Sequence, residues 1–277
     1  MKRIRYNRLA AMGVAVAALA LSAVFAHAGD GRTCPGSTPN PTSATLGLRD
    51  FNDCPTSTLT FTNNYPSLVS VHDDTLDCFG FANRHTWSFS TDGSTDAAFE
   101  NCSAYRFCAD VTLSGTGGGE GGLRLSPWWS AHNDGQFMLN ANTGEVACFG
   151  GRLPFYSFTV NNGVHYVKGT TAHMEIVYFP HSLSSADPAT ITYNLTYASV
   201  AYTSGPLPFD QGNTAEDPPH GLWGELVPAY AGGYMMGYLG QGVNVDFQGS
   251  WANICFENDQ ATPTHHSTWG QLKTQYR

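Results

Sequence analysis

The chain has 277 residues, only 13% of them charged, and its 22 acidic residues outnumber its 13 lysines and arginines. A chain of this composition lacks the cationic clusters that neutralise phosphates, so nucleic acid is excluded as an expected partner. The length suffices for one large β domain with a sizeable core.

The first 28 residues have the organisation of a bacterial-type secretory signal peptide. Four basic residues precede an apolar run over residues 9–25, and Ala26-His27-Ala28 follows the small-residue cleavage rule. A retained membrane anchor is the alternative, but the run is shorter than the roughly 20 residues that a bilayer requires. We therefore expect cleavage after Ala28, no transmembrane segment in the mature chain, and a secreted protein that is extracellular or at the cell surface.

Cleavage would also change the charge of the protein. Because four of the 13 basic residues are removed, the mature chain keeps 9 against 22 acidic residues, a net charge of −13. Residues 29–56, which follow the cleavage point, are rich in Pro, Thr, Ser and Gly. This composition predicts a lead-in to the folded domain, either ordered by a disulfide or flexible.

All seven cysteines lie in the mature chain, and export permits disulfides. No Cys-x-x-Cys pair is present, which disfavours zinc-ribbon and thioredoxin-like proteins. Spacing does not determine the connectivity. The pairings that we predict are Cys34 with Cys54, Cys102 with Cys108 and Cys148 with Cys255, which leaves Cys78 over.

Between residues 57 and 258 the sequence consists of short apolar-polar alternations separated by turn residues. Alternation with a period of two marks strands that bury one face, and no amphipathic helix is evident. The expected strands include 59–61, 85–90, 105–113, 123–125, 136–140, 172–179, 191–197 and 245–256. The pattern predicts an all-β fold, an antiparallel two-sheet sandwich stapled by disulfides.

The order of these strands resembles the concanavalin A-like jelly roll of legume lectins, laminin-G-like modules and several glycan-cleaving enzymes. Residues 59–61 resemble its edge strand, 173–179 with 191–197 its central hairpin, and 245–256 the closing strand that returns beside the first. The resemblance implies a jelly roll over residues 57–258 and a polysaccharide or other glycan as partner.

The sequence departs from the enzymes of that fold. It has no Glu-x-Asp-x-x-Glu strand like the family-16-type glucanases, and neither the Arg-rich strand nor the Gln-x-His of jelly-roll alginate lyases. No segment matches the metal-binding loop of legume lectins. The resemblance therefore implies a fold and a class of partner but transfers no catalytic residues.

The stretch 121–158 combines rigid aromatic residues, turn glycines and spaced polar groups. Trp128 and Trp129 can stack on the apolar faces of sugars, and Asn133 and Arg152 can supply hydrogen bonds, so these four are the predicted ligand-binding residues. Packing of both tryptophans over a sheet edge is the alternative. Asp134 is a candidate calcium ligand, with an Asx turn before Gly135 as the alternative. No cofactor is expected to be required beyond such a structural calcium.

Two carboxylates are the candidate catalytic groups. Glu145 lies in the same central stretch, and Glu175 lies on an expected strand with His173 on the same side. A strand-borne Glu-His pair on a concave face could act as an acid-base couple. A polar pair on a solvated sheet face is the alternative.

Two further segments are predicted to lie outside the sheet centres. The glycine-rich residues 117–122 are followed by no Gly-Lys-Ser/Thr, so we expect a mobile loop and no phosphate-binding loop. Tyr230, Tyr234 and Tyr238 recur at every fourth residue among glycines, which disfavours a helix and predicts a strand and loop at the sheet rim.

Residues 259–277 form a tail that is either a frayed terminus or a sorting tag. Trp269-Gly270 and the basic end resemble the tails of some bacterial secreted proteins. The sequence thus favours a secreted lectin-like domain that binds a glycan through aromatic and amide side chains on a concave sheet. A structural surface or matrix protein is the first alternative and a glycan-cleaving hydrolase or lyase the second, because the carboxylate motifs of such enzymes are missing.

Overall fold

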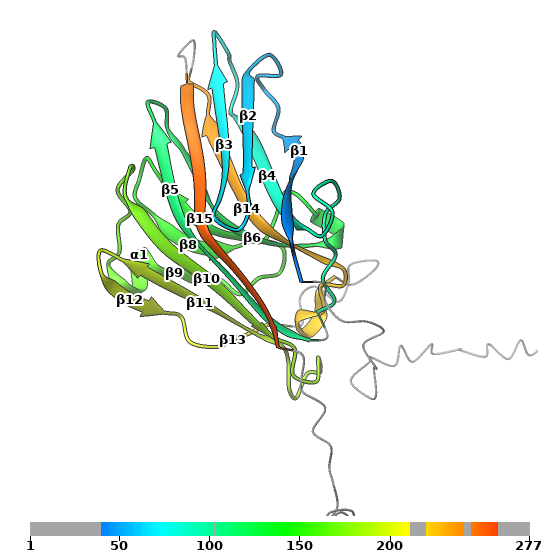
Figure 1. Cartoon of the computed structure of the whole chain (residues 1–277). Coiled ribbons are helices and arrows are strands. Elements are labelled where there is room, and N and C mark those ends of the chain that lie inside the picture. The colour runs from blue at the N-terminus through cyan, green and yellow to red at the C-terminus, as the bar shows by residue number, and fades with distance from the viewer. Residues whose placement is uncertain (1–39, 102, 211–219, 241–244, 260–277) are drawn as a thin grey trace, which may run out of the picture.

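The protein is a sandwich of two antiparallel β-sheets in a computed structural model that describes residues 40–101, 103–210, 220–240 and 245–259 (Figure 1). The predicted signal peptide, the tail after Asp259, Cys34 and Cys102 lie outside these described residues. Within them, no helix has the length and apolar character needed to cross a membrane. The predicted all-β, disulfide-stapled sandwich is confirmed.

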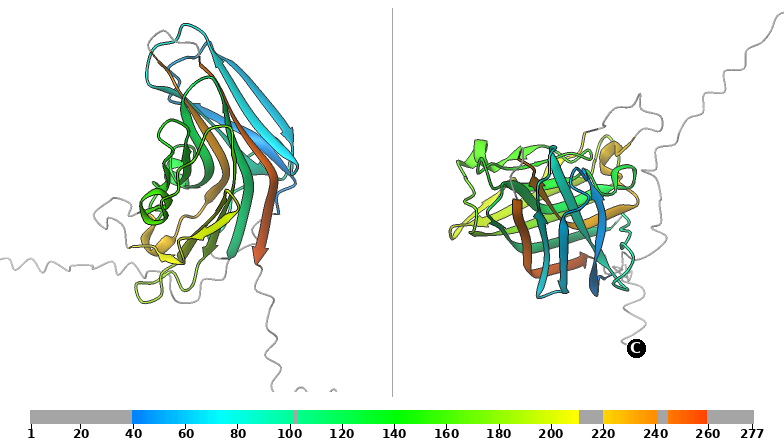
Figure 2. Two further views of the ribbon diagram at one scale, coloured as in Figure 1. Left: turned by 90° about the vertical axis from the view of Figure 1, so that its left-hand side faces the viewer. Right: turned by 90° about the horizontal axis from the view of Figure 1, so that it is seen from above.

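One sheet has seven strands and lies on the inside of the curve that both sheets share (Figure 2). Its strands, in spatial order, are β1 (Ser43–Asp50), β4 (Ala82–Ser90), β14 (Ala229–Tyr238), β6 (Gly119–Pro127), β7 (Gln136–Asn140), β8 (Val146–Phe149) and β9 (Tyr156–Ser157).

The other sheet lies on the outside of the curve. In spatial order it contains β12 (Val200–Thr203), β11 (Thr190–Tyr197), β10 (Thr171–Phe179), β5 (Ala104–Gly115), β15 (Val245–Asp259), β3 (Leu68–Thr75) and β2 (Thr58–Asn64), and β13 (Leu207–Pro208) pairs with β11. The helices are short: η1 (Trp128–Ser130), α1 (Phe158–Asn162) and η2 (Leu222–Gly224).

The sheet begins earlier in the chain than the composition suggested. β1 lies within the expected lead-in and pairs with β4 at the edge of the seven-stranded sheet. β2 is the edge strand of the other sheet, as predicted. The closing strand β15 lies between β5 and β3, one strand removed from β2 rather than beside it.

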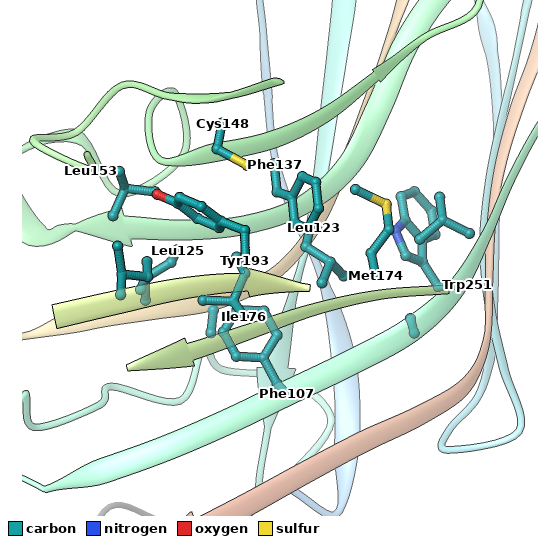
Figure 3. Packing of buried hydrophobic residues seen from close by; sticks show 14 of the residues in the cluster. Phe107, Leu123, Leu125, Phe137, Cys148, Leu153, Met174, Ile176, Tyr193 and Trp251 are labelled. Carbon is teal, nitrogen blue, oxygen red and sulfur yellow. The ribbon is translucent and has the colours of Figure 1, made fainter. Parts of the chain in front are cut away.

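The core lies between the two sheets and consists of the apolar side chains on the inward face of each strand (Figure 3). On β10, Ala172, Met174, Ile176 and Tyr178 are fully buried, while the residues between them face outward. Trp251 of β15 packs edge-on against Trp87 of β4, and its indole nitrogen donates to the Gly122 carbonyl at 2.9 Å. Aromatic packing of this kind joins the two sheets through the core.

A buried polar link also joins the sheets. Asp73 of β3 accepts a hydrogen bond from Asn83 of β4 at 2.9 Å, and its Oδ2 lies 2.9 Å from Nε2 of His85. All three side chains are buried. Burial acts to raise the pKa of Asp73, but the hydrogen bonds from His85, Ser57 and Asn83 together lower it below its usual value. Asp73 is therefore an ionised group inside the sandwich.

The predicted disulfide pairings are wrong for every pair with a described cysteine. Cys54 pairs with Cys78, because the β2–β3 hairpin brings the residues just before β2 and just after β3 together, with a Cα–Cα distance of 5.5 Å. Cys108 pairs with Cys255, its register partner on the neighbouring strand. Cys148, predicted to bond Cys255, is a free and buried thiol on β8 in the opposite sheet.

Two predictions about glycine-rich segments are also wrong. Residues 119–122 belong to β6, an interior and fully buried strand, and not to a mobile loop. The tyrosines 230, 234 and 238 lie on β14, between β4 and β6, and not at a sheet rim. Glycine is needed here for close packing: a Cβ on Gly121 would come within 2.8 Å of the Tyr234 carbonyl oxygen and 2.9 Å of a Leu113 methyl.

Candidate functional site

The outer face of the seven-stranded sheet, on the inside of the curve, carries a dense set of polar side chains. Strand alternation places them there, because their neighbours in sequence point into the core. They are Arg84, Thr86 and Ser88 on β4, Glu120, Arg124 and Ser126 on β6, Gln136 and Asn140 on β7, and Tyr234 and Tyr238 on β14. All are buried except Tyr238, which is half-buried.

Glu120 is the central carboxylate of this face. The register places it between Met236 on β14 and Asn140 on β7. The Tyr238 hydroxyl donates to Glu120 Oε2 at 2.5 Å and accepts from the Asn140 amide at 3.2 Å. Burial raises the pKa of Glu120, and this outweighs the lowering by Tyr238, Arg84 and Tyr234. Glu120 thus holds its proton to a higher pH than an exposed glutamate does.

Tyr234 links Glu120 to the neighbouring groups. Its hydroxyl lies 3.2 Å from Gln136 Oε1 and 3.4 Å from Glu120 Oε1, and it donates to either oxygen. The Arg84 guanidinium lies over its ring, 4.2 Å from the centroid, in a cation-π contact. Burial raises the pKa of Tyr234 and of Tyr238 well above the usual value, so both hydroxyls remain donors at physiological pH.

The loop 128–135 lies over part of this face. Hydrogen bonds from two arginines of the sheet to backbone carbonyls of the loop hold it there. The Arg84 Nε donates to the His132 carbonyl at 3.2 Å, and the Arg124 guanidinium donates to the Ala131 carbonyl. Arg124 also reaches across β14 to Ser88 Oγ at 2.6 Å. The Arg124 side chain can cross β14 at this point because Gly232, which lies between Arg124 and Ser88 in the register, has no side chain.

Trp128, Trp129 and Arg152, predicted as ligand-binding residues, are brought together at the end of this face, where β6 ends. Trp129 stacks on His220 with ring centroids 4.6 Å apart, and Trp128 meets both rings edge-on. A Cβ on Gly221 would touch both the Arg152 side chain and the Trp129 ring at 3.0 Å, which places these two side chains together. Trp128 is 45% exposed. We call Trp128, Trp129, Arg152 and His220 the aromatic cluster.

The other two residues predicted in the central loop have backbone roles. Asn133 is exposed, and its carbonyl accepts from the Gln136 amide at 3.1 Å. Asp134 is partly buried, and its carbonyl accepts from Ser126 Oγ at 2.6 Å. The described residues contain no group of three or more His, Cys, Asp or Glu side chains that could hold a metal ion. Calcium binding by Asp134 stays a prediction.

The structure separates the predicted catalytic candidates. Glu175 and His173 lie on the outer face of the eight-stranded sheet, in the polar arrangement that we gave as the alternative. His173 Nδ1 lies 2.7 Å from Asp110, and Glu175 accepts from Asn194 at 2.8 Å. Glu145 lies on the opposite side of the sandwich, exposed at the turn between β7 and β8. Glu175 and Glu145 therefore cannot act on one bond.

The sequence contained a signal for the residues that were missed. Tyr234 and Tyr238 are four residues apart, an even spacing that puts both on one face of a strand. Glu120 and Arg124 share the same spacing on β6. Even spacing across two neighbouring glycine-containing strands is therefore the pattern that identifies this polar face.

No family model matches the chain, and no curated protein matches it. Among solved structures it is similar to the carbohydrate recognition domain of Emp47p, with 7% identity, a TM-score of 0.39, and coverage of 81% of this chain and 91% of that chain. It is similar to an alginate lyase from Alteromonas sp. 272, with 8% identity, a TM-score of 0.36, and coverage of 73% and 94%. Arcelin-5, a lectin-like defense protein from Phaseolus vulgaris, has 11% identity, a TM-score of 0.31, and coverage of 78% and 99%. At 7 to 11% identity, these similarities concern the fold alone.

Proposed function

We propose that the protein is a secreted lectin-like domain that binds a glycan at the aromatic cluster. The observation that carries this proposal is the position of Trp128, which is 45% exposed and supported edge-on by Trp129 and His220. An exposed, rigid indole offers an apolar surface to the C–H face of a sugar ring. Arg152, whose side chain lies near Trp129, carries guanidinium donors of the kind that hydroxyl or carboxylate oxygens accept.

The surroundings of the aromatic cluster support a preformed site. The preceding strand β6 is fully buried, and the following loop is fixed to the sheet through Arg84 and Arg124. A site held by a rigid sheet loses little conformational entropy when a ligand binds. The disulfides fit an exported protein, in agreement with the predicted signal peptide.

Trp128→Ala is expected to weaken glycan binding at least about tenfold, the loss that accompanies removal of a central aromatic contact. The measurement is a glycan-array screen of residues 29–277, followed by titration of the best-retained glycan with wild type and variant. Phe179→Ala is the matched control, because Phe179 is a similarly exposed aromatic residue, 50% accessible, on the other sheet. Unchanged binding by a folded Trp128→Ala protein would refute the site.

A repeat of the screen with a calcium chelator tests the candidate ligand Asp134. Loss of binding on chelation, restored by added calcium, would support a calcium site in the loop 128–135. Binding that is insensitive to the chelator would exclude a calcium requirement. A folded protein that binds no glycan on the array would favour the structural alternative for this chain.

A further inference from the structure

We propose that Glu120 and Glu145 form the acid-base pair of a glycan-hydrolysing site on the outer face of the seven-stranded sheet. Glu120 would act as the general acid and Glu145 as the general base. The inference rests on the proposed function, because its substrate is a glycan that the aromatic cluster helps to hold. It adds an activity that binding alone does not require.

The strand register places these two glutamates on one row across the sheet. Glu120 on β6 is paired with Asn140 on β7, and the Asn140 N–H donates to the Glu145 carbonyl at 2.8 Å. Neighbouring strands lie about 4.8 Å apart, so the two glutamate backbones are separated by roughly 10 Å. Side chains that leave one face of a sheet at this backbone spacing can bring their carboxyl groups to about 6.5–9.5 Å, the separation typical of glycosidases that invert the anomeric centre.

Both side chains belong to the same face. Glu145 directly precedes Val146, which is buried in the core, so the alternation along the chain directs Glu145 outward. Glu120 lies between two glycines on β6, and its side chain contacts Tyr238 and Tyr234 on the outer face. Asn140 lies between the two glutamates in the register, and its buried side chain donates to the Tyr238 hydroxyl.

The surroundings of the two carboxylates differ in the way that an acid and a base require. Glu120 is only 7% exposed, and burial raises its pKa, whereas Glu145 is exposed to solvent. Tyr238 donates to Glu120 Oε2, and Tyr234 lies nearer to Gln136 than to Glu120 Oε1. We assign the proton to Oε1, which has the longer of the two tyrosine contacts, with Tyr234 donating to Gln136. A buried carboxyl group near an exposed one suits the division into acid and base.

An aromatic surface adjoins the pair. Phe81, just before β4, is 62% exposed and packs against the Tyr238 ring with centroids 5.9 Å apart. A sugar ring stacked on Phe81 would lie next to the Glu120–Asn140–Glu145 row. The aromatic cluster lies at the other end of the same sheet, roughly 26 Å from Glu120 along β6 at about 3.3 Å per residue. The substrate class that fits is a polysaccharide and not a single sugar.

The reaction is hydrolysis of one glycosidic bond. Glu145 accepts a proton from water as the water oxygen attacks the anomeric carbon from one side of the sugar ring. Glu120 gives its proton to the glycosidic oxygen as the bond between carbon and that oxygen breaks. One water is consumed, the new reducing end has the inverted configuration, and proton exchange with solvent returns both carboxyl groups to their starting states.

The experiment incubates residues 29–277 with xylan, mannan, carboxymethyl cellulose, polygalacturonate and chitosan and measures binding and new reducing ends. We expect one of these polymers to be bound and cleaved, with proton NMR showing the inverted anomer first. Glu145→Gln and Glu120→Gln should each lower the rate at least about 100-fold without loss of binding, as is typical when a general acid or base is removed. Because Glu145 is exposed, its variant is expected to fold even if Glu120→Gln does not.

The matched control is Glu175→Gln on the other sheet, which should leave the rate unchanged. Binding of a polymer without new reducing ends would overturn the hydrolase and leave the proposed lectin function standing. Neither binding nor cleavage by folded protein would overturn both. Full activity of Glu145→Gln, or products that absorb as unsaturated sugars, would also overturn the assignment, the latter because elimination consumes no water.

Discussion

Asp73→Ala is expected to lower the free energy of unfolding by about 1–3 kcal/mol, the usual cost of leaving a buried polar group without its hydrogen-bond partner. The variant leaves His85 and Asn83 buried between the sheets without the carboxylate that they contact. A buried polar group without its partner retains the full cost of desolvation. The measurement is equilibrium unfolding in guanidinium chloride, with far-UV circular dichroism as the probe.

Asp246→Ala is the matched control for this variant. Asp246 also faces a histidine, with 2.6 Å between its Oδ1 and Nε2 of His72, but its side chain is 51% exposed. Ion pairs in solvent contribute about 0–1 kcal/mol, so this variant should be close to wild type in stability. Equal effects of the two substitutions would contradict the assignment of Asp73 as the polar link between the sheets.

The same carboxylate makes the stability of the sandwich depend on pH. The pKa of Asp73 is lower in the folded state than in the unfolded chain. Its contribution is therefore fully present above the unfolded value of about 3.9 and is lost as the pH falls through the lowered folded value. We expect wild type to lose stability below about pH 4 more steeply than Asp73→Ala, and parallel curves would contradict this prediction.

The Cys108→Ala/Cys255→Ala double variant is expected to lose about 5 kcal/mol of stability. Its disulfide joins residues 147 positions apart, and the entropy that a cross-link removes from the unfolded chain grows with the length of the closed loop. The Cys54–Cys78 disulfide closes a loop of only 24 positions, for which the same relation gives about 3.5 kcal/mol. Removal of the disulfide that closes the longer loop should therefore lower the free energy of unfolding more.

Thermal and denaturant unfolding of Cys108→Ala/Cys255→Ala and Cys54→Ala/Cys78→Ala test which disulfide contributes more to stability. Peptide mapping without reduction is the necessary companion, because it identifies the Cys108–Cys255 cross-link directly. Equal losses in the two double variants would indicate that local packing and not loop length decides the contribution. A cross-link between Cys148 and Cys255 in the map would contradict the observed pairing.

Local alternation predicted most of the sheet, because it depends on neighbours in the chain. The segment 136–140 is β7 without any shift, and the expected strand 172–179 is β10, which buries one side of its alternation. The disulfides could not be predicted in the same way. Their partners are set by which strands become neighbours, and β5 meets β15 only after the chain has crossed between sheets several times.

The candidate site was partly predictable for a related reason. Trp128, Trp129 and Arg152 were recognised as residue types that bind sugars, and the structure brings them together. Glu120 was missed because its neighbouring glycines were interpreted as loop residues. In the structure the glycines meet tightly packed backbone and side chains, a requirement that depends on β14 and β7 and not on the local sequence.

The reactivity of the buried Cys148 thiol is a native measure of how often the sandwich opens. Its side chain is fully buried, and burial raises the pKa of the thiol well above the usual value, so the reactive thiolate is scarce in the native state. A thiol reagent can modify it only when β8 separates from the core. The labelling rate at this residue, followed by mass spectrometry, would therefore report how often the edge of the seven-stranded sheet opens, without any engineered probe.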